Sequence, residues 1–384
     1  MAKLLGSPKA LSITIIVAAV FAVSILGGAL GNAFGLGFLA SSLPAIQLPA
    51  EIVVRGFHTP LGDWDLMNTM VTTWLAMAVL TALALLIRSR LRETPGRLQA
   101  LFELIFEFFL GLCESVAGKE RARRFFPLVF TIFIFIVVAN WMGILPGIGT
   151  IGRIADPTEI ARHHGDYEYS DPAKVTSHTE GNTVKSTGHV PDPSEDAHGD
   201  HLSSVKLHVF SGTGSISFLS PGSLSEELTF SEYKKNNGEL GEGKRAGHLI
   251  PFLRSANTDV NMTLAMAIVA MIMVHYWGFN ILGAFGHAGK FINFREGPIG
   301  FFVGILELIS EIARVISFTF RLFGNIFAGE VLLMAMGFLL PLIGIIPFLG
   351  LELFVGLIQA FIFAMLTLVF ASMASVSHGG DEHH

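Results

Sequence analysis

An arginine lies in the middle of a long apolar segment near the C-terminus. Residues 298–340 are mostly apolar and contain Arg321 about halfway along. A helix needs only about 20 apolar residues to cross a bilayer. An arginine at mid-membrane costs from about 2.5 to more than 10 kcal/mol, so a functional role is the first hypothesis. Static pairing within a helix bundle, or snorkelling to the headgroups, is the alternative.

Other polar residues share the helical face of Arg321. At 100° per residue, the members of this polar stripe lie within about 40° of the arginine. They are Glu307, Ser310, Arg314, Ser317, Arg321 and Asn325. For any one serine among them, hydrogen bonding between helices is the simpler explanation.

The carboxylates beyond the arginine lie on another face. Glu330 comes nine residues later, which places it about 180° away and about 13 Å further along the helix axis. Glu352 and Gln359 are seven residues apart and share a face of the last apolar helix. This arrangement suggests two separate polar routes that end near one fixed cation. Arginine suits the separating position because a guanidinium keeps its charge even when it is desolvated.

The composition indicates an all-α polytopic membrane protein. Hydrophobic residues make up 51% of the 384 residues and charged residues 15%, below the roughly 25% of soluble domains. The single cysteine, Cys113, excludes an internal disulfide framework and a cysteine-rich metal site. The chain lacks the HExxH, P-loop, GxGxxG and GxSxG motifs of common soluble enzymes.

The apolar runs predict about five to six crossings. We expect them at 11–30, 68–87, 125–145, 259–282, 298–340 and 348–376. Residues 1–65 would form an N-terminal anchor or cleaved signal with an external linker. Residues 88–124 hold eight Lys/Arg against five Glu, which predicts the cytoplasmic side. The run 298–340 is either one steeply tilted helix or a re-entrant pair; the absence of proline before Pro341 favours the tilted helix.

Two segments differ from the spans. Residues 95–117 have apolar side chains at helical spacing with glutamates between them, which predicts an amphipathic helix at the cytoplasmic surface. This helix belongs to a first transmembrane unit, 66–146. Residues 147–257 form a polar extracytoplasmic insert, with a possible β-hairpin at 205–219. Four histidines in the insert are candidate metal ligands, though solvated side chains are the simpler reading: His163, His164, His198 and His201. The spans 258–376 would translocate ions, and 377–384 would be a cytoplasmic tail.

Several of these segments resemble a known family. RLFGNIFAGE (321–330) closely resembles the signature of subunit a of bacterial F-type ATP synthases. Further blocks that look like the family are PGRLQALFELI (95–105), DVNMTLAMA (259–267), ELISEIARVISFTFRLFGN (307–325) and QAFIFAMLTLVFASMAS (359–375). The insert is longer than is usual for the family.

The resemblance implies a role for each matching residue. Arg321 matches the essential arginine that faces the ion-carrying carboxylate of subunit c. Glu330, Glu352 and Gln359 match positions of the external half-channel, as does Asn140 in the earlier span. Positions near the arginine and on the cytoplasmic route match Glu307, Ser310, Ser317 and Asn325. Family members often combine an acid with a histidine at the positions of Glu330 and Glu352, whereas both are glutamate here.

The implied function is that of a non-catalytic stator subunit in the plasma membrane. Two half-channels would carry protons to and from the ring of c subunits, with Arg321 between them. The implied partners are the c-ring, the b-subunit stalk and membrane lipids, with no nucleic acid, metal or cofactor. The alternative is a stand-alone secondary transporter that binds an anionic substrate through Arg321. Such transporters often show repeats and broken helices, and neither is evident here. The sequence leaves open whether the ion is H⁺ or Na⁺.

Overall fold

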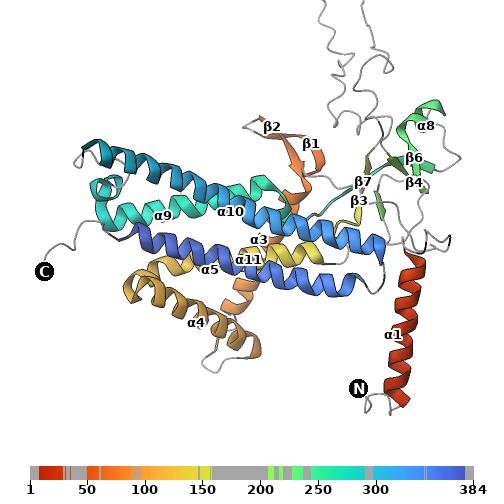
Figure 1. The fold of residues 1–384 in the computed structure, drawn as a ribbon, viewed down its shortest axis with the longest axis horizontal. Coiled ribbons are helices and arrows are strands. Elements are labelled where there is room, and N and C mark those ends of the chain that lie inside the picture. The colour runs from red at the N-terminus through yellow and green to blue at the C-terminus, as the bar shows by residue number, and fades with distance from the viewer. Residues whose placement is uncertain are drawn as a thin grey trace, which may run out of the picture.

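A bundle of long helices dominates the computed structural model (Figure 1). The structure describes residues 8–28, 31, 35, 50–59, 62–89, 91–92, 96–145, 148–155, 157, 206–211, 216–218, 227–236, 244–289, 297–340, 342 and 344–376. Its longer helices are α1 (Pro8–Gly27), α3 (Asn68–Ser89), α4 (Arg97–Ala117), α5 (Lys119–Ile144), α9 (Val260–Ala288), α10 (Gly297–Leu339) and α11 (Ile345–Ala374). All of these except α4 include a segment long and apolar enough to cross a membrane.

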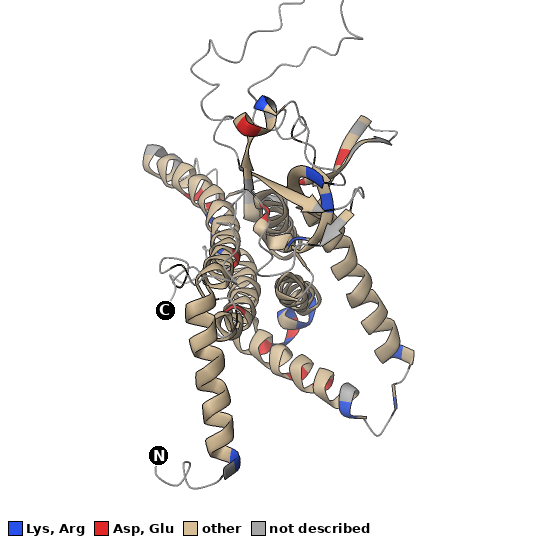
Figure 2. Ribbon diagram, turned by 90° about the vertical axis from the view of Figure 1, so that its right-hand side faces the viewer, with Lys and Arg blue, Asp and Glu red and all other residues tan. Residues whose placement is uncertain are grey.

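The six candidate spans confirm the predicted class of polytopic helical membrane protein. Figure 2 shows that most of the helical ribbon is uncharged, with Lys and Arg gathered toward helix ends. α1 stands apart from the bundle in Figure 1 and crosses its direction. It contacts the turn between α10 and α11, where Leu342 N donates to Ser24 Oγ at 3.3 Å.

The segment around Arg321 is one continuous helix. α10 has 43 residues, which corresponds to about 64 Å of length. That is about twice the hydrocarbon thickness of a bilayer. The alternative of a re-entrant pair is therefore wrong, because the helix carries no break between Gly297 and Leu339.

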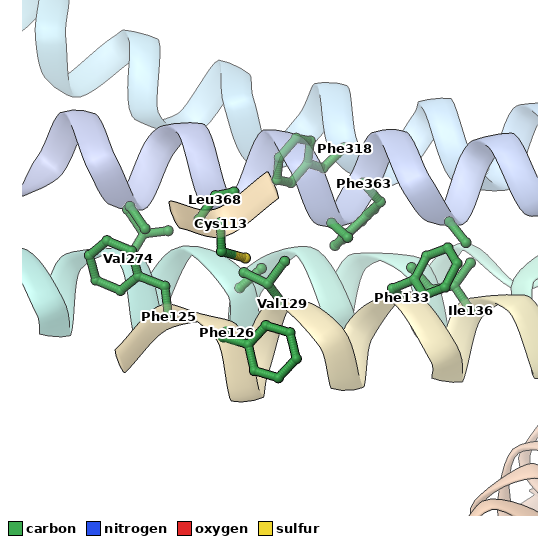
Figure 3. Close-up of a cluster of buried hydrophobic side chains, with 14 of the residues drawn as sticks. Cys113, Phe125, Phe126, Val129, Phe133, Ile136, Val274, Phe318, Phe363 and Leu368 are labelled. Carbon is green, nitrogen blue, oxygen red and sulfur yellow. The ribbon is translucent and has the colours of Figure 1, made fainter. Parts of the chain in front are cut away.

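Large apolar side chains hold the bundle together. α5 lies against α11 and α4, and α9 and α10 complete the packing. Figure 3 shows Phe125, Val129 and Phe133 of α5 facing Phe363 and Leu368 of α11. The ring of Phe318 in α10 lies 4.8 Å from that of Phe363, measured between ring centroids, with the two planes tilted by 34°. Because Phe318 is buried and Ser317 is exposed, this packing turns the polar stripe of α10 away from the core.

α4 confirms the helix predicted from its periodicity. Its buried side chains, Phe109, Cys113 and Ala117, belong to the common core. Phe106 packs edge-on against Phe126 of α5 at 4.4 Å. Gly118 joins α4 to α5 with φ of 77°, a conformation that residues with a Cβ rarely adopt. The tight connection lays α4 alongside α5 (Figure 1).

Strands cluster at one end of the bundle (Figure 1). A hairpin joins β1 (Ile52–Thr59) to β2 (Gly62–Met67) directly before α3. The second sheet has the order β5-β3-β7-β4-β6. Its strands are β3 (Ile151–Ala155), β4 (Lys206–Ser211), β5 (Ile216–Phe218), β6 (Glu227–Thr229) and β7 (Lys244–Pro251), with a short helix α8 (Phe230–Lys235) after β6.

The hairpin predicted at 205–219 is wrong. Both of its halves are strands, but β4 pairs with β6 and β7, while β5 pairs with β3. Alternation within a strand reports which face is buried and leaves the choice of partner open. Leu207 faces the small core of Ala155, Ala246 and Ile250, and this burial places β4 between β7 and β6.

Candidate half-channel site

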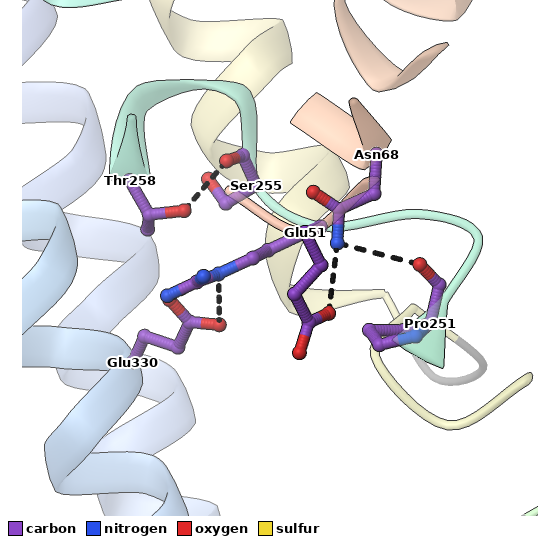
Figure 4. A network of polar contacts seen from close by, with 7 residues as sticks. Glu51, Asn68, Pro251, Ser255, Thr258 and Glu330 are labelled. Carbon is purple, nitrogen blue, oxygen red and sulfur yellow. Dashed lines mark hydrogen bonds and ion pairs between the residues drawn. The ribbon is translucent and has the colours of Figure 1, made fainter. Parts of the chain in front are cut away.

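An ion pair joins the strand end of the molecule to α10. Arg254 follows β7 and leads into a short 3-10 helix, η2 (Ala256–Thr258). Its Nε lies 3.2 Å from Glu330 Oε1, and its Nη2 lies 3.2 Å from Glu330 Oε2. The side chain of Arg254 is 7% exposed and that of Glu330 29%. Figure 4 shows Glu330 of α10 facing the segment that carries Ser255 and Thr258.

The same arginine anchors α3. Its backbone N–H donates to Thr72 Oγ1 at 3.2 Å. One turn earlier, Asn68 Nδ2 donates to Glu51 Oε2 at 3.1 Å and to the Pro251 carbonyl at 3.3 Å (Figure 4). The first turns of α3, the end of β7 and Glu330 of α10 therefore meet around Arg254.

Glu51 is a second carboxylate of this group. Burial raises the pKa of Glu51 to about 7, against the lowering effect of the Arg254 charge; the charge of Glu330 raises it further. A carboxyl group with this pKa exchanges protons near neutral pH, as a proton relay requires. Arg254, Glu330 and Glu51 thus carry one fixed positive charge between two acids.

Replacing Glu51 by glutamine is expected to remove a pH-dependent cost of folding. The pKa of Glu51 rises from 4.5 to about 7 on folding, so the buried carboxyl is neutral at low pH and must be buried as an anion above pH 7. Wild-type stability therefore falls as pH rises through this window, and that of Glu51→Gln does not. Thermal denaturation of the solubilised complex at about pH 5 and about pH 8 measures this. A variant whose advantage is equal at both pH values would contradict the expectation.

A buried amide chain extends the polar group toward α11. Asn257 Nδ2 donates to Asn140 Oδ1 at 2.6 Å, and Asn140 Nδ2 donates to the Gly356 carbonyl at 3.1 Å. Asn140 and Asn257 are 2% and 0% exposed. Asn140 therefore connects α5, η2 and α11 in the interior.

Glu352 lies against the backbone of α10. Its carboxylate occupies the space that a Cβ at Gly329 would need, so the absence of a side chain there lets the two helices approach. Glu352 is 7% exposed, and Glu330 follows Gly329 directly in the chain. Gln359 is half-buried two turns further along α11. The structure therefore brings Glu330, Glu352 and Asn140 to one end of the bundle.

For the proton translocation that the resemblance implies, Gly329→Ala is expected to slow pumping about 10- to 100-fold. The new side chain would overlap the Glu352 carboxylate, and overpacking of this kind costs about 1–3 kcal/mol. Gly337→Ala is the matched control on α10, because a Cβ there makes an ordinary 3.7 Å contact with Ile345. ATP-driven acidification of inverted vesicles measures the effect. Equal pumping rates in the two variants would show that the position of the Glu352 carboxylate against Gly329 does not matter for pumping.

Arg321 itself has a sparse environment. Its Nη2 donates to Ser317 Oγ at 3.3 Å, on the exposed side of α10. Within the described residues, no carboxylate forms an ion pair with it, while Asn325 is exposed on the same face. Glu330 does not pair with Arg321, as the helical wheel predicted. Its carboxylate pairs with Arg254 instead.

The first part of the stripe is a chain of ion pairs. Arg314 Nη2 lies 3.4 Å from Glu307 Oε1, and Arg314 Nη1 also binds Glu311. The guanidinium lies over the ring of Phe370, 4.9 Å from its centroid. Ser310 is half-buried nearby on α10. Polar side chains therefore gather on both sides of Arg321, in two groups with different partners.

Several residues of the site were not predicted from the sequence. Arg254 and Glu51 lie in polar segments outside the spans, and only the fold brings them to Glu330. Glu311 lies about 80° from Arg321 on the helical wheel, outside the stripe. His275 could have been found from the sequence, because an ionisable residue within a predicted membrane span indicates a functional site.

The four candidate metal ligands of the insert lie outside the described residues: His163, His164, His198 and His201. Within the described part of the chain, no group of three His, Cys, Asp or Glu side chains could hold a metal ion.

Comparison with known proteins identifies the family. The family model described as "ATP synthase A chain" matches residues 70–180 and 245–372, which is more than half of the chain. ATP synthase subunit a of Mycobacterium bovis is 27% identical over 344 residues, covering 88% of this chain and 98% of the relative. The subunit of Desulforamulus reducens is 26% identical and covers 82% of each chain. That of Gloeobacter violaceus is 24% identical, covering 83% of this chain and 86% of the relative. With these matches and six helices able to cross a membrane, the chain belongs to the subunit a family of F-type ATP synthases, the proton-translocating subunit of the membrane sector.

Proposed function

We propose that this subunit supplies two half-channels to the rotor of the ATP synthase, with Arg321 between them. Protons reach the ion-carrying carboxylates of the c-ring through one and leave through the other. The proposal rests on one observation: polar groups lie on both sides of Arg321, and each group has its own arginine, while Arg321 binds only Ser317 among described residues.

The external half-channel runs through the group at the strand end. Its members are Asn140, Glu330, Glu352 and Gln359, joined by Glu51 and Arg254. The cytoplasmic half-channel follows the polar stripe of α10 through Asn325, Ser317, Ser310 and Glu307. The exposed face of Arg321 then receives a carboxylate from another polypeptide, the c-ring.

The orientation follows from charge. Residues 88–124, with eight Lys/Arg, lie in the cytoplasm, so the strands and the 147–257 insert lie outside and the C-terminus inside. α4 lies at the cytoplasmic surface and the b-subunit stalk completes the stator. The subunit takes no catalytic part in making ATP, since its polar groups carry only protons. The 66–146 unit scaffolds the 258–376 helices.

The structure gives the transporter alternative no support. Secondary transporters commonly bind substrate at helices broken near the midplane. α10 is unbroken over its 43 residues.

Labelling of single cysteines tests the two half-channels. In a background with Cys113→Ser, we expect Asn325→Cys to react with a small, membrane-impermeant, charged thiol reagent from the cytoplasmic side. Glu330→Cys should react from the outside, because it belongs to the external group and its side chain is 29% exposed. Ala76→Cys, buried in α3, serves as the unreactive control. Labelling of both test residues from one side only would overturn the proposal.

A further inference from the structure

The end of α9 folds back on itself. Gly283 has φ of 76°, and the helix bends there. The bend brings His287, which is 1% exposed, back against His275. His275 Nδ1 and His287 Nε2 lie 3.2 Å apart. Gly278 makes this possible, since a Cβ there would overlap the ring of His287.

The pair continues onto α10. His275 Nε2 lies 3.6 Å from Glu311 Oε2, and Glu311 binds Arg314. Arg314 in turn pairs with Glu307 of the stripe. Arg314 lies seven residues before Arg321, about 10 Å along the axis and on the same face. A continuous series of ionisable groups therefore runs from the stripe to the bend of α9.

The surroundings of these groups are apolar. A pocket beside His275 and Glu311 is lined by Ile268, Met271, Ile272, Ile312 and Val315. Phe279 lies 4.6 Å from His287, measured between ring centroids. Charged groups that face the histidines within the described residues are Glu311 and, behind it, Arg314. His287 is almost fully buried and His275 is 28% exposed, and two polar rings in these apolar surroundings call for a reason beyond packing.

We propose that His275 and His287, with Glu311, form the group through which protons leave the cytoplasmic half-channel. The inference rests on the proposed function. The Glu311 carboxylate takes up a proton from the half-channel and passes it to His275 Nε2, and the imidazolium releases its Nδ1 proton to His287 Nε2. His287 then releases its Nδ1 proton to a water molecule at the cytoplasmic end of α9. Each ring gains one proton and loses one, and no electrons are transferred. Imidazole suits this step because it exchanges protons near neutral pH.

Alanine variants in the assembled complex test this group. Passive proton conduction is measured in vesicles freed of the ATPase sector and driven by a potassium diffusion potential. We expect His275→Ala to slow conduction by about tenfold, a smaller loss than that of a positioned catalytic acid because water can substitute. Free imidazole, added equally on both sides so that it creates no gradient, should restore the rate. His248→Ala, in β7, is the matched control and should change neither rate nor response.

A second variant guards against a purely structural effect. Gly278→Ala displaces the His287 ring without removing an imidazole, so it should slow conduction, with rescue by imidazole as in His275→Ala. Normal conduction in His275→Ala overturns the inference. Slow conduction that imidazole fails to restore in both variants assigns the histidines to folding and overturns it as well. If Asn325→Cys reacts from the cytoplasm while His275→Ala conducts normally, this inference alone fails and the half-channels stand.

Discussion

Replacing Arg321 by alanine is expected to abolish ATP-driven proton pumping while passive proton conduction persists. A rotor carboxylate that passes the stator without a counter-charge must enter the bilayer as a bare anion or remain protonated. Leaving one member of a buried ion pair alone costs about 3–5 kcal/mol, which corresponds to a rate loss of about 150- to 5,000-fold. The half-channels themselves would remain, so protons could still cross without coupling to rotation.

The measurement compares two quantities in the same inverted vesicles. ATP-driven acidification reports coupled pumping, and proton leak after removal of the ATPase sector reports conduction. Arg321→Lys is the matched variant: it keeps a positive charge but loses the planar guanidinium and can release its proton when desolvated. We expect it to pump poorly as well. Normal pumping in Arg321→Ala would show that this residue is not the barrier between the two half-channels.

The sequence predicted the helices well because their signal is local. Apolar runs of sufficient length can hardly be anything else, and the ends of α3, α5, α9 and α11 agree with their runs to within six residues. The helical wheel likewise separated Arg321 from Glu330 correctly, because 100° per residue holds along an unbroken helix.

Contacts between segments that are distant in the chain could not be predicted from the sequence. Arg254 and Glu330 are 76 residues apart, and no local pattern pairs them. The strands β4 and β5 show the same limit: alternation revealed strands, but the choice of partner depended on where Leu207 is buried. The fold-back that joins His275 to His287 depends on one residue with positive φ, Gly283. Glycine in an apolar helix is too common for that bend to be read in advance.

The pair of Arg254 and Glu330 leads to the second large effect. Replacing Arg254 by glutamine is expected to reduce both the amount of assembled subunit and the pumping rate per complex. The Glu330 carboxylate would remain in a partly buried site beside Glu51, another acid, with no positive charge from Arg254. The cost of breaking such a pair is about 3–5 kcal/mol when it is fully buried. Since Glu330 is 29% exposed, we expect the lower end of this range.

A double-mutant cycle separates the charge from the shape of the pair. Arg254→Gln and Glu330→Gln are made singly and together, and assembly is measured as retained subunit in solubilised membranes after heating. The double variant should assemble better than Arg254→Gln alone, because it removes the carboxylate that lost its partner. Its pumping should stay low, because a glutamine at 330 can no longer accept and release a proton.

Arg153→Gln is the matched control, since its Nη2 donates to the Ile52 carbonyl at 3.0 Å, close to the same cluster but away from Glu330. Additive losses in the cycle would mean that the two side chains act independently. Recovery of both assembly and pumping in the double variant would show that Glu330 holds the fold together and carries no protons.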